Sequence, residues 1–256
     1  MRAKNLMQSR IQILARSAQQ VGNVNPGTTT SWLSVQLWLP AILSTTAGAV
    51  DVIGFLALGG LFAAHITGKL AIVAAHYTTG RFGQIGPILA VPGFIVVPGV
   101  VVLLFGRTES KGRSRRALLV LHAALLSICL GFGLSFGPFS KSDSPMAVLV
   151  GMLAVAAMAT QNAMAKLALV KAPSTAVMTT NTTQLIIDLA TLARGGEVSD
   201  NLAKVRQRAR VTFLCFAGFV GGCVAGAILE LRLGIGALAL PVILAALAVP
   251  LGELKD

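Results

Sequence analysis

The ten residues Arg107-Thr108-Glu109-Ser110-Lys111-Gly112-Arg113-Ser114-Arg115-Arg116 join two long apolar stretches of the chain, 85–105 and 117–137. Five of these ten residues are basic and one is acidic. Short loops rich in Lys and Arg remain on the cytoplasmic side when a chain inserts into a membrane. If the two flanking stretches cross a membrane, this basic loop therefore lies on the cytoplasmic side.

The composition of the chain is that of an integral membrane protein. Its 256 residues are 55% hydrophobic and 12% charged, with a mean hydropathy of +0.78. Soluble domains carry about 25% charged residues, so the polar residues here are too few to cover a soluble enzyme or a DNA-binding domain. The net charge is +12, yet only 5% of the residues are aromatic and the basic residues avoid the apolar stretches. This pattern favours topology signals over nucleic-acid contacts.

Eight apolar stretches are candidates for membrane helices: 32–58, 61–77, 85–105, 117–137, 146–170, 175–193, 211–231 and 233–251. A spanning helix needs about 20 mostly apolar residues, and six of the stretches meet that requirement. The second and the sixth are marginal, because polar side chains crowd their first turns.

The basic residues decide whether those two marginal stretches cross. Most of them gather in three blocks: Arg2, Lys4, Arg10 and Arg16; Arg107, Lys111, Arg113, Arg115 and Arg116; and Arg194, Lys204, Arg206, Arg208 and Arg210. If all eight stretches cross, the middle block faces outward, against the positive-inside rule. If the second and sixth enter and leave by one face, sixteen basic residues lie inside and three outside. The sequence thus predicts an all-α polytopic transmembrane helix bundle in the cell (inner or plasma) membrane, with six crossing helices, two re-entrant half-helices and both termini cytoplasmic.

Three crossings precede the loop 138–145 and three follow it, so the two halves have opposite orientations. Inverted repeats built around discontinuous helices are a recurrent transporter architecture. We therefore divide the chain into a basic cytoplasmic tail (1–31), a first membrane repeat (32–137) and a second membrane repeat (146–253). Short matches follow the same order in both halves: 65–70 (HITGKL) with 177–182 (VMTTNT), Asp51 with Gln161-Asn162, and Gly93-Phe94 with Gly218-Phe219.

Asp51 is the most informative ionisable residue inside an apolar stretch. A charged side chain at membrane depth costs at least about 2.5 kcal/mol on insertion scales, so it needs a partner or an aqueous cavity. Asp51 lies between Gly48 and Gly54, which permit close helix approach, and its carboxylate is expected to face protein. One interpretation is a proton- or cation-linked site. The other is structural: an ion pair with Lys69, or a cap for the following stretch.

Two polar turns, Thr67-Gly68-Lys69 and Thr179-Thr180-Asn181, have the composition of irregular backbone that leads into a helix. Thr and Asn side chains accept hydrogen bonds from free N–H groups at a helix start. Such a start at membrane depth suits an anion or a substrate carboxylate; alternatively, the hydroxyls satisfy only their own backbone. The predicted substrate- or ion-binding residues are Asp51, His65, Thr67, Gly68, Lys69, Gln161, Asn162, Thr179, Thr180 and Asn181.

Further along the sixth stretch, Thr180, Gln184 and Asp188 are spaced to share one helical face. That face has two interpretations. It lines a cavity, or Asp188 pairs with Arg194 near the cytoplasmic edge.

The remaining signals are structural. A G-x-x-x-G-x-x-x-G row, which packs membrane helices closely, is formed by Gly218, Gly222 and Gly226. Packing within the chain is the favoured role of this row, and a homo-oligomer contact is the alternative.

The sequence has no catalytic, cofactor-binding or C-x-x-C motif, so we expect no enzyme activity, no cofactor and no metal. Three cysteines within apolar runs are expected to be buried: Cys129, Cys215 and Cys223.

The sequence resembles the YoaK family of uncharacterised multi-pass membrane proteins. The resemblance covers roughly 37–251 and rests on Gly48-x-x-Asp51-x-x-Gly54-Phe55, His65-x-Thr67-Gly68-Lys69-Leu70, Gln161-Asn162-Ala163, and Ser174-Thr175 followed by Thr179-Thr180-Asn181. The family pattern is similar to H-x-T-G-N in the first half and T-G-N or T-G-T in the second. Lys69 thus stands where Asn is typical, and Thr180 where Gly is typical. The resemblance implies a multi-pass bacterial membrane protein and no established substrate or activity.

Together these features predict a secondary transporter of a small solute, an anion among the candidates. The two Thr-rich turns would face a central site, with Asp51 as the coupling or ion-pairing group. The lipid bilayer is the expected partner, and nucleic acid is not. The alternatives are a non-transporting membrane module that binds a lipid or a protein through its Gly-rich helices, and a passive channel.

Overall fold

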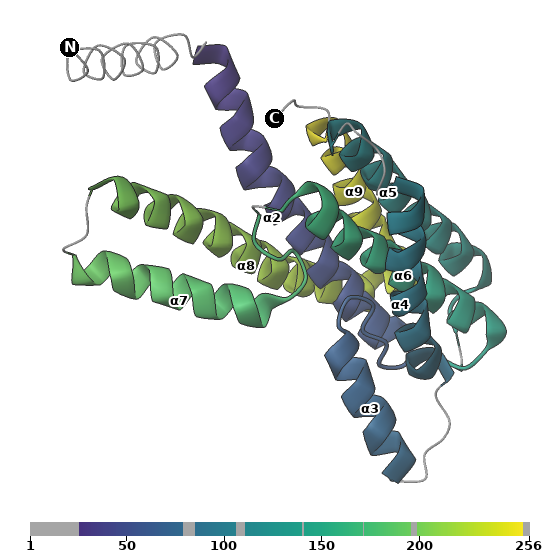
Figure 1. Cartoon of the computed structure of the whole chain (residues 1–256). Helices are drawn as coiled ribbons and strands as arrows, with labels where there is room; N and C mark the ends of the chain where they lie inside the picture. Colours follow the sequence, from purple (N-terminus) through teal and green to yellow (C-terminus); the bar gives the residue numbers. More distant parts are fainter. Residues whose placement is uncertain are drawn as a thin grey trace, which may run out of the picture.

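The structure, a computed structural model, describes residues 26–78, 85–105, 111–139, 141–170, 172–195 and 199–252. Within these ranges every regular element is helical, which confirms the all-α class. The elements in Figure 1 are α2 (Pro26–Ala57), α3 (Ile66–Thr78), α4 (Ile85–Phe105), α5 (Lys111–Phe136), α6 (Pro145–Ala168), α7 (Met178–Arg194), α8 (Ser199–Leu233), the 3₁₀ helix η1 (Gly234–Leu238) and α9 (Ala239–Leu251). Residues 1–25 of the predicted tail lie outside the described residues, and α2 begins inside the remainder of that tail.

Five helical segments of the described chain are long and apolar enough to cross a membrane: Leu37–Ala57, Ile85–Phe105, Ser114–Phe136, Pro145–Ala168 and Asn201–Leu251. The last has 51 residues and runs through α8, η1 and α9, which is enough for more than one crossing. α3 and α7 have 13 and 17 residues. At 1.5 Å per residue they are about 20 and 26 Å long, shorter than a hydrocarbon core of about 30 Å.

The outer surface of the helix bundle is apolar, as contact with lipid requires. α4 shows this most clearly, because its large apolar side chains are mostly exposed; Leu103 is 80% exposed. A contiguous apolar surface of this kind on a soluble protein marks an interaction site. Around membrane-spanning helices it is the surface that meets the acyl chains, so the bilayer is a partner of this protein.

α2 and α8 form the most extensive helix pair and run in the same direction. The glycine row of α8 permits their close approach. A Cβ atom added to Gly222 would lie 2.1 Å from the backbone oxygen of Thr45, and one added to Gly218 would lie 2.8 Å from that of Ala41. The row is therefore buried against α2 of the same chain, which confirms packing as its role. This face is not available for the homo-oligomer contact through Gly218, Gly222 and Gly226 that the sequence left open.

α4 and α6 form a second pair with the same relative direction. Both begin at one end of the molecule, where the Ile85 N–H at the start of α4 donates to Oδ1 of Asp143, just before α6, at 3.0 Å. Further along, Gly93 of α4 faces Met152 and Val155 of α6. α5 packs against α6 and α9, and α9 packs against α2, which closes the bundle.

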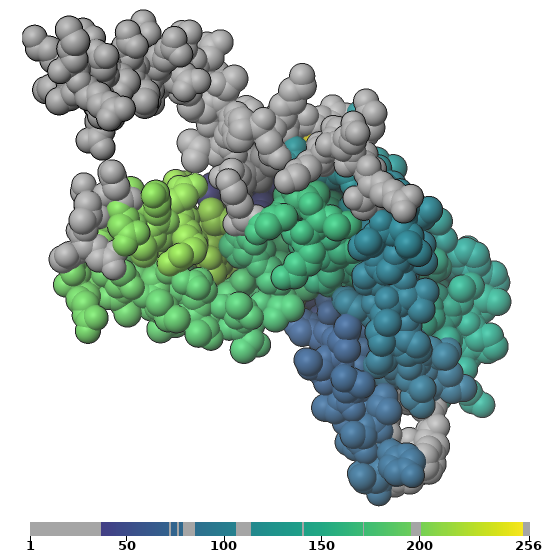
Figure 2. Space-filling view, viewed as in Figure 1, coloured from purple at the N-terminus to yellow at the C-terminus, as the bar shows by residue number. Residues whose placement is uncertain are grey.

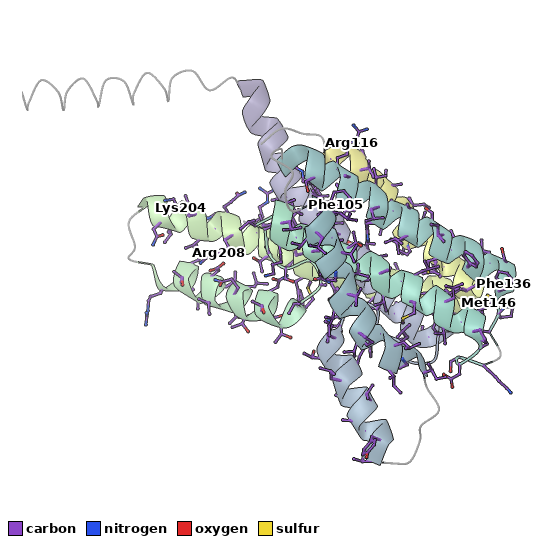
Figure 3. All side chains as sticks on the ribbon, turned by 45° about the vertical axis from the view of Figure 1, so that its right-hand side comes forward. Phe105, Arg116, Phe136, Met146, Lys204 and Arg208 are labelled. Carbon is purple, nitrogen blue, oxygen red and sulfur yellow. The ribbon has the colours of Figure 1, made fainter. Side chains whose placement is uncertain are left out.

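Several of the described basic residues lie at the opposite end of the molecule. Arg115, near the start of α5, is buried, and its Nε donates to the backbone oxygen of Gly252 beyond α9 at 3.1 Å. Figure 3 shows Arg116, Lys204 and Arg208 toward this end of the molecule, with the α5–α6 connection at the other. Arg115 and Arg116 of the second basic block therefore lie toward the same end as Lys204 and Arg208 of the third. That this end is cytoplasmic stays a prediction.

α3 and α7 leave the bundle as parts of two separate lobes (Figures 1 and 2). α3 extends from one end, whereas α7 packs along the first half of α8. The segments that precede the two helices instead turn back into the bundle, so that Leu61, Ala63, Thr175 and Ala176 are buried. Non-helical backbone is thus held inside the protein at two places.

Candidate functional site

The loop between α2 and α3 carries peptide groups into the core. Two glycines of positive φ follow the end of α2, Gly59 at 67° and Gly60 at 84°, and the Gly60 N–H donates to the backbone oxygen of Phe55 at 2.9 Å. This Schellman arrangement needs a left-handed residue, which glycine supplies without a Cβ clash. Leu61 then packs so closely on α6 that a Cβ on Gly151 would lie 2.5 Å from its side chain. The turn therefore points the chain back into the bundle.

Asp51 satisfies the buried peptide groups of that loop. Its Oδ1 accepts the backbone N–H of Ala64 at 2.7 Å, and its Oδ2 is bonded to Nδ1 of His65. A buried N–H that water does not reach needs an internal partner. The cap predicted from the sequence is therefore present, just before α3. The alternative ion pair with Lys69 is not the one that forms, because His65 is the residue that pairs with the carboxylate.

Lys69, the fourth residue of α3, is 1% exposed. Its Nζ donates to the backbone oxygen of Ala63 at 3.2 Å and lies 5.3 Å from the centroid of the Phe94 ring. An aromatic face attracts a cation, and the attraction grows when water is excluded. The ammonium is therefore held by a loop carbonyl and an aromatic ring.

The His65 side chain is 34% exposed, whereas Asp51 is buried. The imidazole lies edge-on to Phe62 and Phe219, with ring centroids 6.3 and 5.8 Å away. His65 thus connects a buried carboxylate with the surface of the protein. We call Asp51, His65 and Lys69 the charged turn.

The loop before α7 is held by amide side chains. Gln161 of α6 is buried, and its Nε2 donates to Oγ1 of Thr175 and to the backbone oxygen of Leu43 on α2, each at 3.0 Å. Asn181, the fourth residue of α7, donates from Nδ2 to the backbone oxygen of Ser174 at 2.6 Å. We call Gln161, Thr175 and Asn181 the amide turn.

The two turns share a hydrogen-bond pattern. In each, a side chain of the preceding long helix binds the residue fourteen positions later. In each, the fourth residue of the short helix folds back onto a loop carbonyl. The sequence matches of Asp51 with Gln161 and of Lys69 with Asn181 therefore join residues in corresponding places.

Both turns contact α2 within its candidate membrane span. Within the span Leu37–Ala57, the Leu43 carbonyl that binds Gln161 is six residues from the start, and Asp51 is six residues from the end. At 1.5 Å per residue, each contact is about 9 Å inside the span, and the two are about 12 Å apart along the helix.

Five predicted site residues take no part in the hydrogen bonds that form these turns: Thr67, Gly68, Asn162, Thr179 and Thr180. The three threonines are exposed, Gly68 is half-buried, and Asn162 donates to the Met158 carbonyl of its own helix at 3.0 Å. The prediction that Thr and Asn side chains cap α7 is wrong, because its N-cap, Val177, makes no side-chain bond. Asn181 donates instead of accepting, since the loop presents a carbonyl to it.

An open cavity of about 1190 Å³ lies between α6, α7 and α8, beside the amide turn. It brings together Asn162, Thr180 and Asn181 from the predicted set. Four basic residues also line it but were not predicted as site residues: Arg115, Lys166, Lys204 and Arg208. Lys204 and Arg208 are four residues apart in the sequence. This spacing places them on one face because 199–210 is helical, which was not predicted from the sequence.

Asp188 pairs with Arg208 and not with Arg194. The buried carboxylate accepts bonds from Nε at 2.9 and 3.1 Å and from Nη2 at 2.5 Å, and Nε2 of Gln184 adds a bond at 2.8 Å. The Arg208 guanidinium holds the pKa of the Asp188 carboxyl below its usual value. This bridge ties α7 to α8. Thr180 and Gln184 line the cavity as one interpretation predicted, and Asp188 lies behind them.

Within the described part of the chain, no group of three His, Cys, Asp or Glu side chains could hold a metal ion. The arrangement offers hydrogen bonding at both turns, a carboxylate–imidazole pair at one, and a basic cavity beside the other.

The fold and these buried polar turns define a multi-pass integral membrane protein. The chain matches a family model described as "Protein of unknown function (DUF1275)" over residues 39–251, and it belongs to that family. It is also similar to the UPF0700 transmembrane protein YoaK of Bacillus subtilis (strain 168), with 31% identity over 126 residues, 46% of this chain and 55% of the relative. The chain thus matches over about half the length of that curated relative, and the resemblance to the YoaK family is confirmed. No solved structure matches the chain.

Proposed function

We propose that this protein is a secondary transporter of a small solute, built as two inverted repeats around the charged turn and the amide turn. The observation that carries the proposal is the shared hydrogen-bond pattern of the two turns at membrane depth. Irregular backbone is tolerated there only where protein buries it or where it lines a cavity. In transporters such broken helices form the substrate and ion sites.

The helix contacts support the repeat. Exchanging α2 with α6, α3 with α7, α4 with α8 and α5 with α9 converts each main helix–helix contact into another contact of the same structure. For example, α2–α8 becomes α6–α4, and α7–α8 becomes α3–α4. α2 and α6 run in opposite directions (Figure 1), as an inverted repeat requires.

Six crossings follow when the fifth span divides at Gly234, so that η1 and α9 together, about 30 Å long, form the sixth. Gly234, at the start of η1, has a φ of 55°, which turns the chain between α8 and α9. The ends of α5 and α9 that carry Arg115 and Gly252 then share a face with the basic part of α8. The positive-inside rule makes this face cytoplasmic.

In the proposed mechanism, each turn meets the solute from one side of the membrane, because the turns lie about 9 Å inside opposite ends of α2. Asp51 is the coupling group. His65, partly exposed, passes a proton to and from the carboxylate as the solute moves.

The test separates this role of Asp51 from its role as a cap. A thermal-shift screen of the purified protein against inorganic ions, carboxylates, amino acids and sugars first identifies ligands, since a ligand of the native state raises its stability. Uptake of the best ligand into proteoliposomes is then compared for wild type, Asp51→Asn and the control Asp143→Asn. An Asn at either position keeps an oxygen that accepts the backbone N–H of the native bond.

Loss of uptake in Asp51→Asn alone, with Tm and membrane insertion unchanged, supports the proposal. Equal uptake in all three proteins would remove Asp51 from the mechanism. Absence of uptake by wild type for every stabilising ligand would favour a membrane module that binds without transport.

A further inference from the structure

We infer that the cavity between α6, α7 and α8 binds a doubly charged oxyanion with an organic body, at the face that carries the basic residues. This inference deepens the proposed transport function, on which it rests for the role of the ligand as solute. The binding itself can be measured without transport.

The charge of the cavity wall selects an anion. The described lining contains four basic side chains and no acidic one. Asp188 compensates Arg208 from behind the wall, and Arg115 is buried with partners of its own, so Lys166 and Lys204 supply the positive charge that faces the cavity. Lys166 and Lys204 are exposed, and among the described residues no carboxylate pairs with either. Two ammonium groups facing one open volume favour a ligand with two negative charges over a ligand with one.

Neutral donors complete the site. Thr212 of α8 is 1% exposed and lines the cavity, and its Oγ1 has no hydrogen-bond partner among the described residues. A buried hydroxyl without a partner is costly, so a bound acceptor stabilises it. α7 also begins at this wall, after its N-cap residue Val177, whose own N–H donates to Oγ of Ser174 at 2.9 Å and whose side chain makes no cap bond. The first N–H groups of α7 itself add partial positive charge.

The rest of the wall determines the body of the ligand. The cavity of about 1190 Å³ exceeds the volume that water or a single inorganic ion needs. Its wall includes apolar side chains, among them Leu167, Leu169 and Val211. Apolar side chains are more favourable surroundings than water for the carbon atoms of a ligand. A dicarboxylate or an organic phosphate therefore fits the cavity better than inorganic phosphate alone.

The experiment measures binding to the full-length protein in detergent. Calorimetric titrations with succinate, inorganic phosphate, acetate and chloride are made at equal ionic strength. We expect succinate to bind at least about tenfold more tightly than acetate or chloride, which is about 1.4 kcal/mol. Added NaCl weakens the binding, because these charges are partly exposed.

Variants test whether the cavity holds the anion. Lys204→Gln and Lys166→Gln each weaken succinate binding about tenfold. Arg206→Gln is the matched control, because it removes one charge from an exposed position of the same helix outside the cavity wall and leaves the affinity unchanged. Asp188→Asn removes the charge that compensates Arg208 and tightens binding severalfold. Equal effects of Lys204→Gln and Arg206→Gln would overturn the inference, as would the absence of succinate and phosphate binding.

A lipid headgroup could supply the same chemistry, so liposomes of phosphatidylcholine with and without phosphatidic acid form a second arm. If succinate binds in lipid-free detergent and phosphatidic acid does not displace it, the ligand is a free solute. If only phosphatidic acid binds, and Lys204→Gln abolishes that binding, the site is confirmed with lipid as its source, and the anion is not the transported solute. If succinate binds but is not taken up, the proposed transport function is refuted and the anion-binding site is still supported. Uptake of an uncharged solute without anion binding refutes only the present inference.

Discussion

Replacement of Gly222 by alanine tests the contact on which the whole bundle depends. The added Cβ would lie 2.1 Å from the backbone oxygen of Thr45, 2.9 Å from its carbonyl carbon and 3.0 Å from its Cα. Ordinary contacts of a Cβ begin at 3.4 Å, so α2 and α8 must separate by more than 1 Å locally. Overpacking costs about 1–3 kcal/mol. Because Thr45 presents backbone, which has no rotamer to change, we expect a cost of about 3 kcal/mol.

That cost corresponds to a fall in Tm of about 6–12 °C for a chain of this size. Thermal unfolding of the purified protein in detergent measures it. Gly221→Ala is the matched control, because a Cβ at Gly221 has no neighbour within 4 Å, and its Tm should remain near that of wild type. Gly226→Ala should fall between them, since its nearest neighbour is the Val52 side chain at 2.7 Å. If Gly222→Ala and Gly221→Ala have equal Tm values, the close approach of α2 and α8 is refuted.

Three further predictions concern topology, the α7–α8 bridge and the core. In a Cys-free background, a membrane-impermeant maleimide should label Ser142→Cys in intact cells and Arg206→Cys only after permeabilisation; the reverse pattern would invert the topology. Arg208→Gln removes the main partner of the buried Asp188 carboxylate, so it should loosen α7 and raise its protease sensitivity by about tenfold, whereas Arg206→Gln should not. His122 is buried, with Nδ1 bonded to the backbone oxygen of Ala157 at 3.0 Å and Nε2 without a partner among the described residues. His122→Leu loses the bond but also removes the unpaired nitrogen, so Tm should stay near that of wild type, and a fall of several degrees would show that the Ala157 bond outweighs it.

The sequence predicted helix positions well where lipid contact determines composition. The stretch 85–105 has the same bounds as α4, because no residue of that helix carries a polar side chain. α8 was predicted to begin at 211, but it begins at Ser199. Its first twelve residues are rich in Ala, Lys, Arg and Gln, which are good helix formers. Hydropathy detects the part of a helix that lies in lipid, so the basic part was assigned to a connecting segment.

The polar turns show which part of a site a sequence can predict. Asp51 and Gln161 were identified because a polar side chain in an apolar stretch must find a partner. The partners were not predictable, because they depend on how a loop folds back. The turn at Gly59 and Gly60 leads into a loop, so α3 begins at Ile66, five residues after the start of the apolar stretch 61–77. The same loop brings Ala64 and His65 to the Asp51 carboxylate. Lys204 and Arg208 were missed because their common face exists only once α8 is extended to Ser199.

The two turns differ in charge although their hydrogen bonds correspond. Asp51 of the charged turn corresponds in position to Gln161 of the amide turn, and Lys69 corresponds to Asn181. An acidic and a basic side chain of one turn are thus replaced by amides in the other. A lone charge at membrane depth is costly, so Asp51 pairs with His65, and the Lys69 ammonium is held by the Ala63 carbonyl and the Phe94 ring. An amide needs no charged partner and cannot take up a proton at physiological pH. On the proposed function, proton coupling therefore belongs to the charged turn alone. The amide turn, with the basic cavity beside it, recognises the solute, so that coupling and recognition act from opposite faces of the membrane.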